Sequence, residues 1–264
     1  DLGRLTYLQA LQQADAREAD RLMRAAIQAL IQWQSRADAL SLPAYDEAFI
    51  RRELQIFVDW CVQREFGRSW NATEQGWWEH SCQVLVRSML DQPQLAMHRD
   101  YMVRNLMVCA APLVTPGILD FQDAVRGPVT YDLVSLLRDA YVSWPAADVR
   151  RWALQCREEQ IAAGLLAADV DARTYLAWFD WMAAQRLLKV VGIFARLSLR
   201  DGKHGYLDDI PLVYRYLRDE VAGHEALRPL HQLLLALLPA YLAKHPAAAG
   251  LLADALPAVT AGQG

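Results

Sequence analysis

The chain has 264 residues, of which 54% are apolar and 22% are charged, and its formal net charge is −4. A chain of this length and composition can bury a sizeable core, which excludes the disordered and fibrous classes and allows one large or two small domains. No long run of either charge occurs, so the charge pattern predicts no nucleic-acid partner and favours a small molecule or a protein.

The cysteines lie far apart, form no Cys-x-x-Cys pair and have apolar neighbours: Cys61, Cys82, Cys109 and Cys156. This pattern predicts reduced thiols and a cytoplasmic protein rather than disulfides or a zinc site. The most apolar stretch, residues 233–243, is shorter than the ~20 residues that span a bilayer. We therefore expect a buried helix there and no membrane partner.

The amino-terminal end carries no signal peptide, because residues 1–20 mix charged and apolar residues without a continuous hydrophobic region. The first methionine is Met23. We therefore expect the sequence to begin partway through a longer product.

Helical periodicity dominates the chain. One face of a first helix collects the apolar residues Leu22, Met23, Ala26, Ile27, Leu30 and Ile31. Further helices are expected at 46–64, 73–90, 131–142, 147–164, 172–199 and 208–222, and a last pair within 225–244. Without an internal repeat or a Gly/Ser linker, residues 1–245 predict one mainly α domain around a small β hairpin or sheet. The Ala/Gly-rich tail at 246–264 is expected to fray.

One region breaks the helical pattern. From Leu95 to Phe121 the chain has short apolar runs interrupted by Pro112, Thr115 and Pro116. This composition predicts a short strand, a polar loop and then a hairpin.

The polar loop reads His-Arg-Asp-Tyr-Met-Val-Arg-Asn at 98–105, and Asp-Phe follows the hairpin at 120–121. Phosphoryl transfer requires a carboxylate that receives a hydroxyl proton and oxygen ligands that hold Mg²⁺ against phosphates. Asp100, Asn105 and Asp120 supply that set. An isolated aspartate in a polar loop is usually a turn former or a helix cap. The three residues in this order, with strands around them, instead favour a kinase lobe.

The segment after Asp120 carries a more specific signature. It contains Phe-Gln-Asp-Ala at 121–124, Gly-Pro at 127–128, Tyr-Asp-Leu at 131–133 and Ser-Leu-Leu-Arg-Asp at 135–139. This string resembles the aminoglycoside phosphotransferase and choline kinase superfamily, and within it the bacterial anomeric kinases for N-acetylmuramate and N-acetylglucosamine. Arg-Glu-Leu at 52–54, Phe-Ala-Arg-Leu at 194–197 and Arg-Asp-Gly-Lys at 200–203 extend the similarity over most of the chain.

The resemblance implies a protein-kinase-like carboxy-terminal lobe that uses ATP or GTP and Mg²⁺. By this resemblance Asp100 is the catalytic base, and Asn105 and Asp120 are metal ligands. Asp123 is a second metal or substrate contact or, equally, a structural cap.

His98 and Asp132 are expected to brace the loop rather than to take part in the chemistry. Met102 departs from the family, which often has histidine at this position, and a substrate contact from there is in doubt.

The part of such a kinase that holds the nucleotide phosphates is not evident. Residues 1–188 contain no lysine, and Gly3, Gly67 and Gly76 are not flanked by strand patterns. No arginine lies on a credible strand before the loop either, where it could replace the lysine. We therefore expect the amino-terminal lobe to be missing from this chain, which would be a poor kinase alone.

The preferred interpretation is an ATP-dependent lobe that phosphorylates a hydroxyl of an amino sugar, in cell-wall sugar recycling. Trp60, Trp70, Trp77 and Trp78 could stack on a sugar, although a packing role is more common for any one of them. Three alternatives remain open: a kinase for a cationic acceptor such as an aminoglycoside or choline, a non-catalytic acceptor-binding fragment, and a purely structural helical protein.

Overall fold

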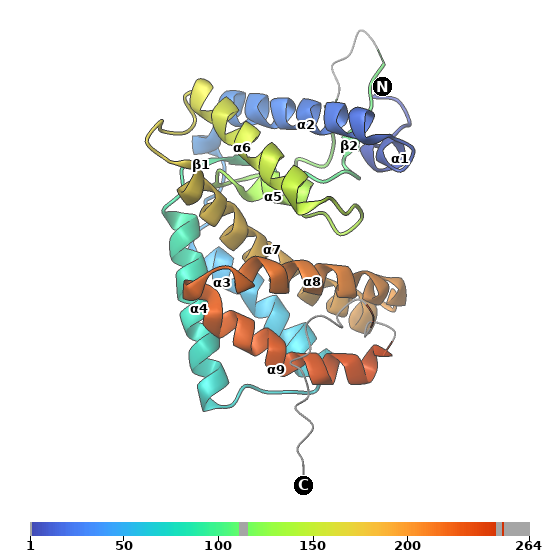
Figure 1. Cartoon of the computed structure of the whole chain (residues 1–264), viewed down its shortest axis with the longest axis vertical. Coiled ribbons are helices and arrows are strands. Elements are labelled where there is room, and N and C mark those ends of the chain that lie inside the picture. Colours follow the sequence, from blue (N-terminus) through green and yellow to red (C-terminus); the bar gives the residue numbers. More distant parts are fainter. Residues whose placement is uncertain (1, 111–115, 247–249, 251–264) are drawn as a thin grey trace. The chain divides into compact units, whose positions relative to one another are not determined.

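The computed structural model describes residues 2–110, 116–246 and 250. It is mostly helical, with two small antiparallel sheets (Figure 1). The chain divides into two compact units. Unit 1 contains Asp1–Ile50 and Val86–Ala183, and unit 2 contains Arg51–Leu85 and Ala184–Gly264. The sequence shows no linker at these divisions because they fall inside the helices α3 (Glu47–Ile56), α4 (Ala72–Leu90) and α7 (Ala172–Asp201).

The helices of unit 1 include the one predicted from residues 22–31. That helix is α2 (Ala16–Arg36), and the predicted apolar face is buried. Asp15 caps it by accepting a hydrogen bond from the Glu18 N–H at 2.8 Å. The other helices of this unit are α1 (Tyr7–Leu11), α5 (Tyr131–Leu137) and α6 (Ala146–Ala162), with a 3₁₀ turn at Ala39–Ser41.

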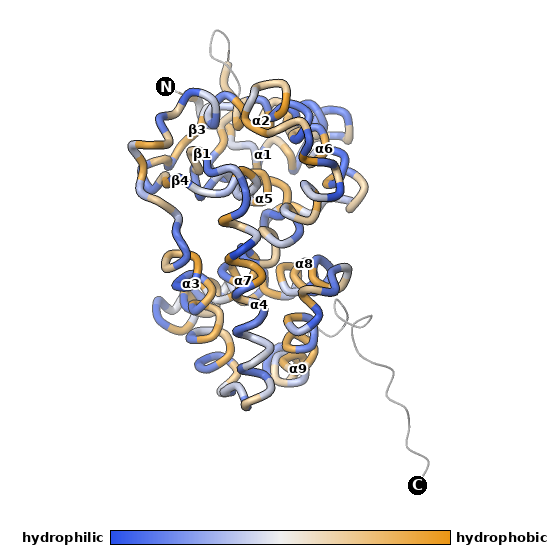
Figure 2. Tube along the Cα trace, turned by 90° about the vertical axis from the view of Figure 1, so that its left-hand side faces the viewer, coloured by the Kyte–Doolittle hydropathy of each residue, from blue (hydrophilic) through white to orange (hydrophobic). Residues whose placement is uncertain are grey.

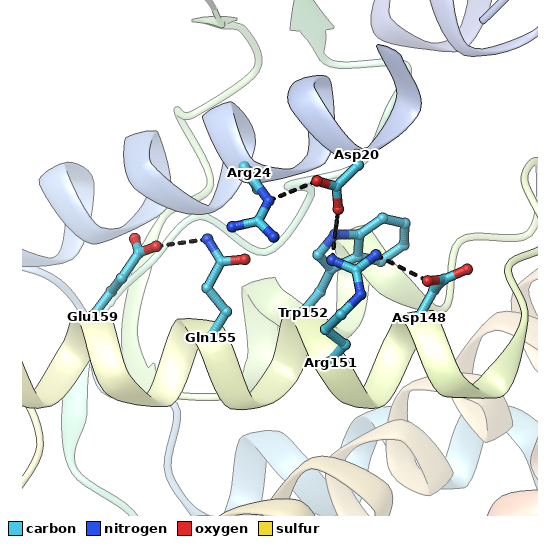
Figure 3. A network of polar contacts seen from close by, with 7 residues as sticks. All are labelled: Asp20, Arg24, Asp148, Arg151, Trp152, Gln155 and Glu159. Atoms are coloured by element: carbon cyan, nitrogen blue, oxygen red, sulfur yellow. Dashed lines mark hydrogen bonds and ion pairs between the residues drawn. The ribbon is translucent and has the colours of Figure 1, made fainter. Parts of the chain in front are cut away.

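A polar network joins α2 to α6 on the surface of unit 1 (Figure 3). Asp20 accepts hydrogen bonds from Arg24 at 2.7 Å, from Arg151 at 2.6 Å and from the indole N–H of Trp152 at 2.9 Å. Partial burial opposes the charge, but these donors outweigh it and lower the pKa of Asp20 to about 2.

The expected strand and hairpin are present in unit 1. Strand β1 (Gln94–Met97) precedes the polar loop, and β2 (Leu106–Met107) pairs antiparallel with β3 (Gly117–Ile118). Pro112 and Thr115, which the hairpin prediction used, lie outside the described residues.

The partner of β1 was missed. It is β4 (Val125–Pro128), which pairs antiparallel with β1. Glycine and proline disfavour a strand, so the sequence did not predict one here. The backbone at Gly127 lies close to Met97, since a Cβ at Gly127 would be 2.7 Å from the Sδ of Met97. A side chain at residue 127 would force the flexible end of Met97 to shift, and Pro128 is tolerated in a ladder of two strands.

Several predicted helix ends were wrong. Helix α5 stops at Leu137 rather than at residue 142, because the Asp139 side chain accepts the Tyr141 N–H and so competes with the helix. The range 46–64 is an α-helix only as far as Ile56, and Phe57–Glu65 continue as a π-helix, η2. The expected pair within 225–244 is a 3₁₀ turn at Glu225–Leu227 followed by one helix, α9 (Arg228–Lys244).

Unit 2 is built from helices alone in its described part. It contains the π-helix, a 3₁₀ segment at His204–Asp209, α8 (Ile210–Ala222), α9 and the parts of α3, α4 and α7 assigned to it. Gly192 of α7 lies against the end of α3, since a Cβ there would be 2.7 Å from the Ile56 carbonyl and the Phe57 nitrogen. Nearby, Lys189 and Glu53 form a buried ion pair at 2.7 Å.

Residues Glu225–Lys244 are, by length and composition, the one stretch of the described chain that could span a membrane, with a mean hydropathy of 1.2. Its leucines at 230, 233, 234, 237 and 238 are buried in unit 2, and α9 shows long hydrophobic stretches in Figure 2. The predicted helix at 233–243 is therefore present, and one of its faces contributes to the core of this unit.

Candidate functional site

The polar loop at 98–105 connects β1 to β2 in unit 1, so it leaves one sheet and enters the other. Its first half is held by Asp132, in the first turn of α5. The Asp132 carboxylate accepts the His98 N–H at 2.7 Å and the Arg99 N–H at 2.9 Å, and it is only 1% exposed. Buried charge-assisted hydrogen bonds of this kind are strong and fix the backbone that they hold. The bracing expected of Asp132 matches these contacts.

The His98 ring lies in the core beside the loop. It packs edge-on against Trp33 and Tyr101, with ring centroids 5.6 and 5.8 Å apart. Burial lowers the pKa of His98, and this effect outweighs the Leu119 carbonyl and the nearby charges of Asp100 and Asp120, which raise it. Burial therefore disfavours the charged form of His98, which packs in the core, and both carboxylates lie within electrostatic reach of its ring.

Asp100, Asn105 and Asp120 are brought together by consecutive hydrogen bonds. The Asn105 side-chain N–H donates to the Asp100 carbonyl at 2.9 Å, and the Asn105 carbonyl accepts the Leu119 N–H at 2.9 Å. Because β2 and β3 pair Leu106 with Ile118, the residues just outside this ladder, Asn105 and Leu119, stay side by side. Asp120 is the next residue, so one edge of the hairpin carries all three.

The backbone is strained on both sides of this edge. Among the non-glycine residues that the structure describes, positive φ occurs at Arg99 (77°) and Asp120 (66°). Left-handed backbone at a non-glycine residue costs roughly 1–3 kcal/mol and is concentrated at functional sites. Arg99 directly precedes the proposed base, and Asp120 is itself a proposed metal ligand.

The donor set fits a magnesium ion. Since the Asn105 amide nitrogen is bound to the Asp100 carbonyl, the amide oxygen faces away from that contact and remains available as a neutral ligand. Asp120 is exposed, and one of its oxygens accepts the Gln122 side-chain N–H at 2.7 Å. No group of three His, Cys, Asp or Glu side chains suited to a metal occurs in residues 2–110, 116–246 and 250. Magnesium commonly takes one or two protein ligands and fills its shell with phosphate and water.

Asp123 is exposed and lies beside the loop through its backbone. Its carbonyl accepts a hydrogen bond from the Arg99 guanidinium at 3.3 Å. The second metal or substrate contact predicted for Asp123 therefore stays a prediction.

Two loop contacts were missed by the sequence analysis. The buried Tyr101 hydroxyl donates to the Ala26 carbonyl of α2 at 2.7 Å, and the Val103 N–H donates to the Asp139 carboxylate at 3.1 Å. Pattern alone cannot reveal them, because both join segments that are 36 or more residues apart in the sequence.

The tryptophans considered for sugar stacking lie in unit 2, where most of them pack against other side chains. Trp78 is buried and stacks on Phe57 and beside Trp70, with centroids 5.9 and 6.2 Å apart. Trp60 is covered by the Arg64 guanidinium at 4.0 Å. Trp77 lines a surface hollow of about 400 Å³.

Comparison with known proteins identifies the family. The phosphotransferase enzyme family matches residues 2–165. The chain belongs to this family. The predicted resemblance is thus confirmed, and the mainly helical fold with small sheets agrees with it.

Three relatives of this phosphotransferase have the same name. The N-acetylmuramate/N-acetylglucosamine kinase of Pseudomonas aeruginosa is 45% identical over 237 residues, which cover 90% of this chain and 68% of the relative. The protein of the same name from Neisseria meningitidis is 41% identical over 239 residues, covering 90% and 70%. That from Caulobacter vibrioides is 33% identical over 180 residues, covering 67% and 47%.

Proposed function

We propose that this phosphotransferase transfers the γ-phosphoryl group of ATP or GTP to a hydroxyl of an amino sugar of the N-acetylmuramate or N-acetylglucosamine class. The observation that carries the proposal is the hydrogen-bonded succession of Asp100, Asn105 and Asp120 at one hairpin edge. The names of the relatives support the amino sugar as acceptor. We further propose the anomeric hydroxyl as the phosphorylated group, cell-wall sugar recycling as the process and the cytoplasm as the location.

In the proposed reaction Asp100 accepts the proton of the sugar hydroxyl while its oxygen forms a bond to the γ-phosphorus and the bond to the nucleoside diphosphate breaks. Asn105 and Asp120 would hold Mg²⁺, which supplies positive charge that neutralises the phosphate oxygens. In this proposal Asp132 keeps the loop in place through its hydrogen bonds to the His98 and Arg99 N–H groups, and His98 does so through its packing against Tyr101.

We find no candidate in this chain for the lysine that binds the nucleotide phosphates in such a kinase. The first lysine in the sequence is Lys189, which is buried in unit 2 and paired with Glu53. We propose that an amino-terminal nucleotide lobe holds the phosphates and belongs to the part of the relatives that this chain does not match. In the P. aeruginosa protein the matched residues make up 68% of the length.

An acceptor panel tests this function. The chain is assayed alone and joined to the part of the P. aeruginosa relative that it does not match, with MgATP and N-acetylmuramate, N-acetylglucosamine, choline or an aminoglycoside. We expect sugar-1-phosphate to be detected by ³¹P nuclear magnetic resonance (NMR) with the two amino sugars, and much more slowly with the chain alone. Transfer only to the cationic acceptors, or to none of the four by the joined protein, would contradict the proposal.

A further inference from the structure

Helix α5 carries a carboxylate at each end, and each one faces a different half of the catalytic loop. All seven residues of the helix, Tyr131–Leu137, are buried. Asp132, in its first turn, accepts the N–H groups of His98 and Arg99. Asp139, just beyond its last turn, accepts the N–H of Val103.

The contact at Asp139 is as sheltered as the one at Asp132. Asp139 is 5% exposed and Val103 is 0% exposed. One Asp139 oxygen accepts the Val103 N–H at 3.1 Å, and the other accepts the Tyr141 N–H at 3.2 Å. A carboxylate engaged by two N–H groups in a dry environment has little freedom to move.

A second contact comes from the same short segment. The guanidinium of Arg104 lies 3.7 Å from the centre of the Tyr141 ring, which is within the range of a cation–π interaction. Asp139 and Tyr141 thus hold two consecutive loop residues, Val103 and Arg104, which come directly before Asn105.

The alternative, that Asp139 serves only to stabilise α5, conflicts with electrostatics. The carboxyl end of a helix carries partial negative charge, so an aspartate just beyond it is unfavourable for the helix itself. The negative charge does not help the helix that precedes it, and the N–H groups that it binds, one of which belongs to the loop, offset part of its cost.

We propose that Asp139 and Tyr141 are positioning residues that set the orientation of the Asn105 side chain. The turn that carries Asn105 is closed by its own N–H, which donates to the Met102 carbonyl at 2.9 Å, and by its side-chain N–H to Asp100. Val103 lies inside that turn, so fixing its N–H fixes the turn. The inference rests on the proposed function only for the role of Asn105 as a metal ligand.

Backbone hydrogen exchange tests, without any need for activity, whether Asp132 and Asp139 hold different halves of the loop. Asp139→Ala should speed exchange of the Val103 amide by roughly 10–100-fold, because one buried charge-assisted hydrogen bond is lost. The His98 and Arg99 amides should keep their protection. Asp132→Ala should give the reverse pattern, and Asp91→Ala, at an exposed site of unit 1, should change neither.

Kinetics of the joined protein then separate positioning from general support. Asp139→Asn keeps the shape and one acceptor oxygen. We therefore expect about a tenfold loss of turnover with Asp139→Asn, which is milder than the loss with Asp139→Ala. The half-saturating Mg²⁺ concentration should rise, and the KM for the sugar should stay unchanged. Tyr141→Leu should shift the Mg²⁺ dependence in the same direction by less.

The inference is overturned if Asp139→Ala leaves Val103 exchange at the wild-type rate, or if it speeds exchange equally across the whole loop. It is also overturned if the Asp139→Asn variant of the joined protein transfers phosphate with the half-saturating Mg²⁺ concentration of the wild type. A joined protein that shows the predicted exchange pattern but transfers no phosphate supports the positioning role while refuting the proposed function.

Discussion

Units 1 and 2 use buried carboxylates in different ways. In unit 1, Asp132 and Asp139 accept backbone N–H groups of a loop. In unit 2, Glu53 binds the side chains of Lys189 and Gln185, which both belong to α7. A carboxylate that binds backbone fixes a local conformation, whereas one that binds side chains joins two helices. Burial alone therefore does not distinguish these carboxylates, whereas the atoms that they bind do.

The largest expected effect concerns a carboxylate that is only partly buried. Asp100→Asn preserves shape but removes proton acceptance, and loss of a general base typically costs ~10²–10⁴ in turnover. Thermal unfolding should stay at the wild-type temperature. The measurement is sugar-dependent release of nucleoside diphosphate by the joined protein, with Asp91→Asn as control. A loss no greater than that of the control would remove Asp100 from the chemistry.

In unit 2 the expected effect is on stability. Lys189→Met leaves the Glu53 carboxylate buried without its lysine, and breaking a buried pair costs about 3–5 kcal/mol. Denaturant unfolding should show this loss, while the loop amides of unit 1 keep their exchange rates under native conditions. The double variant Glu53→Leu/Lys189→Met should recover most of the loss. If the double variant is as unstable as the single one, the pair is not what Lys189 contributes.

A smaller effect is expected from the contact between α7 and α3 in unit 2. Gly192→Ala introduces a Cβ at 2.7 Å from backbone atoms of Ile56 and Phe57, and such overpacking typically costs about 1–3 kcal/mol. Gly223→Ala is the matched control, because a Cβ there meets no atom within 4 Å. Equal stabilities of the two variants would show that the helices can separate without cost.

The smallest effect belongs to the surface network of unit 1. The pKa of Asp20 is lowered to about 2, so its contribution is complete above the ordinary aspartate pKa of about 4 and is lost as the pH falls toward 2. Asp20→Asn should cost about 1 kcal/mol at neutral pH and flatten the pH dependence of stability in that window. An unchanged slope between pH 4 and 2 in the variant would contradict this account.

The sequence predicted those features that depend on local pattern. The periodicity of α2, the hairpin around the loop and the order of Asp100, Asn105 and Asp120 were all visible, because each is encoded within a few residues. The wrong features depend on distant partners. Strand β4 pairs with β1, with Gly127 against Met97, and Asp139, which accepts the Tyr141 N–H just beyond α5, also binds Val103, 36 residues away. The π-helix likewise begins where Gly192 packs against Ile56, which no local pattern records.

The central claim, that Asp100, Asn105 and Asp120 form one metal-nucleotide site, is tested most directly by paramagnetic NMR on this chain. Mn²⁺ in place of Mg²⁺ broadens the signals of nearby nuclei, so no turnover is required. We predict that Mn²⁺ with ATP broadens the amide signals of Asp100, Asn105 and Asp120 together, and that Asp120→Asn weakens the broadening at all three. Broadening centred elsewhere in the chain, or at Asp120 without Asn105, would contradict the claim.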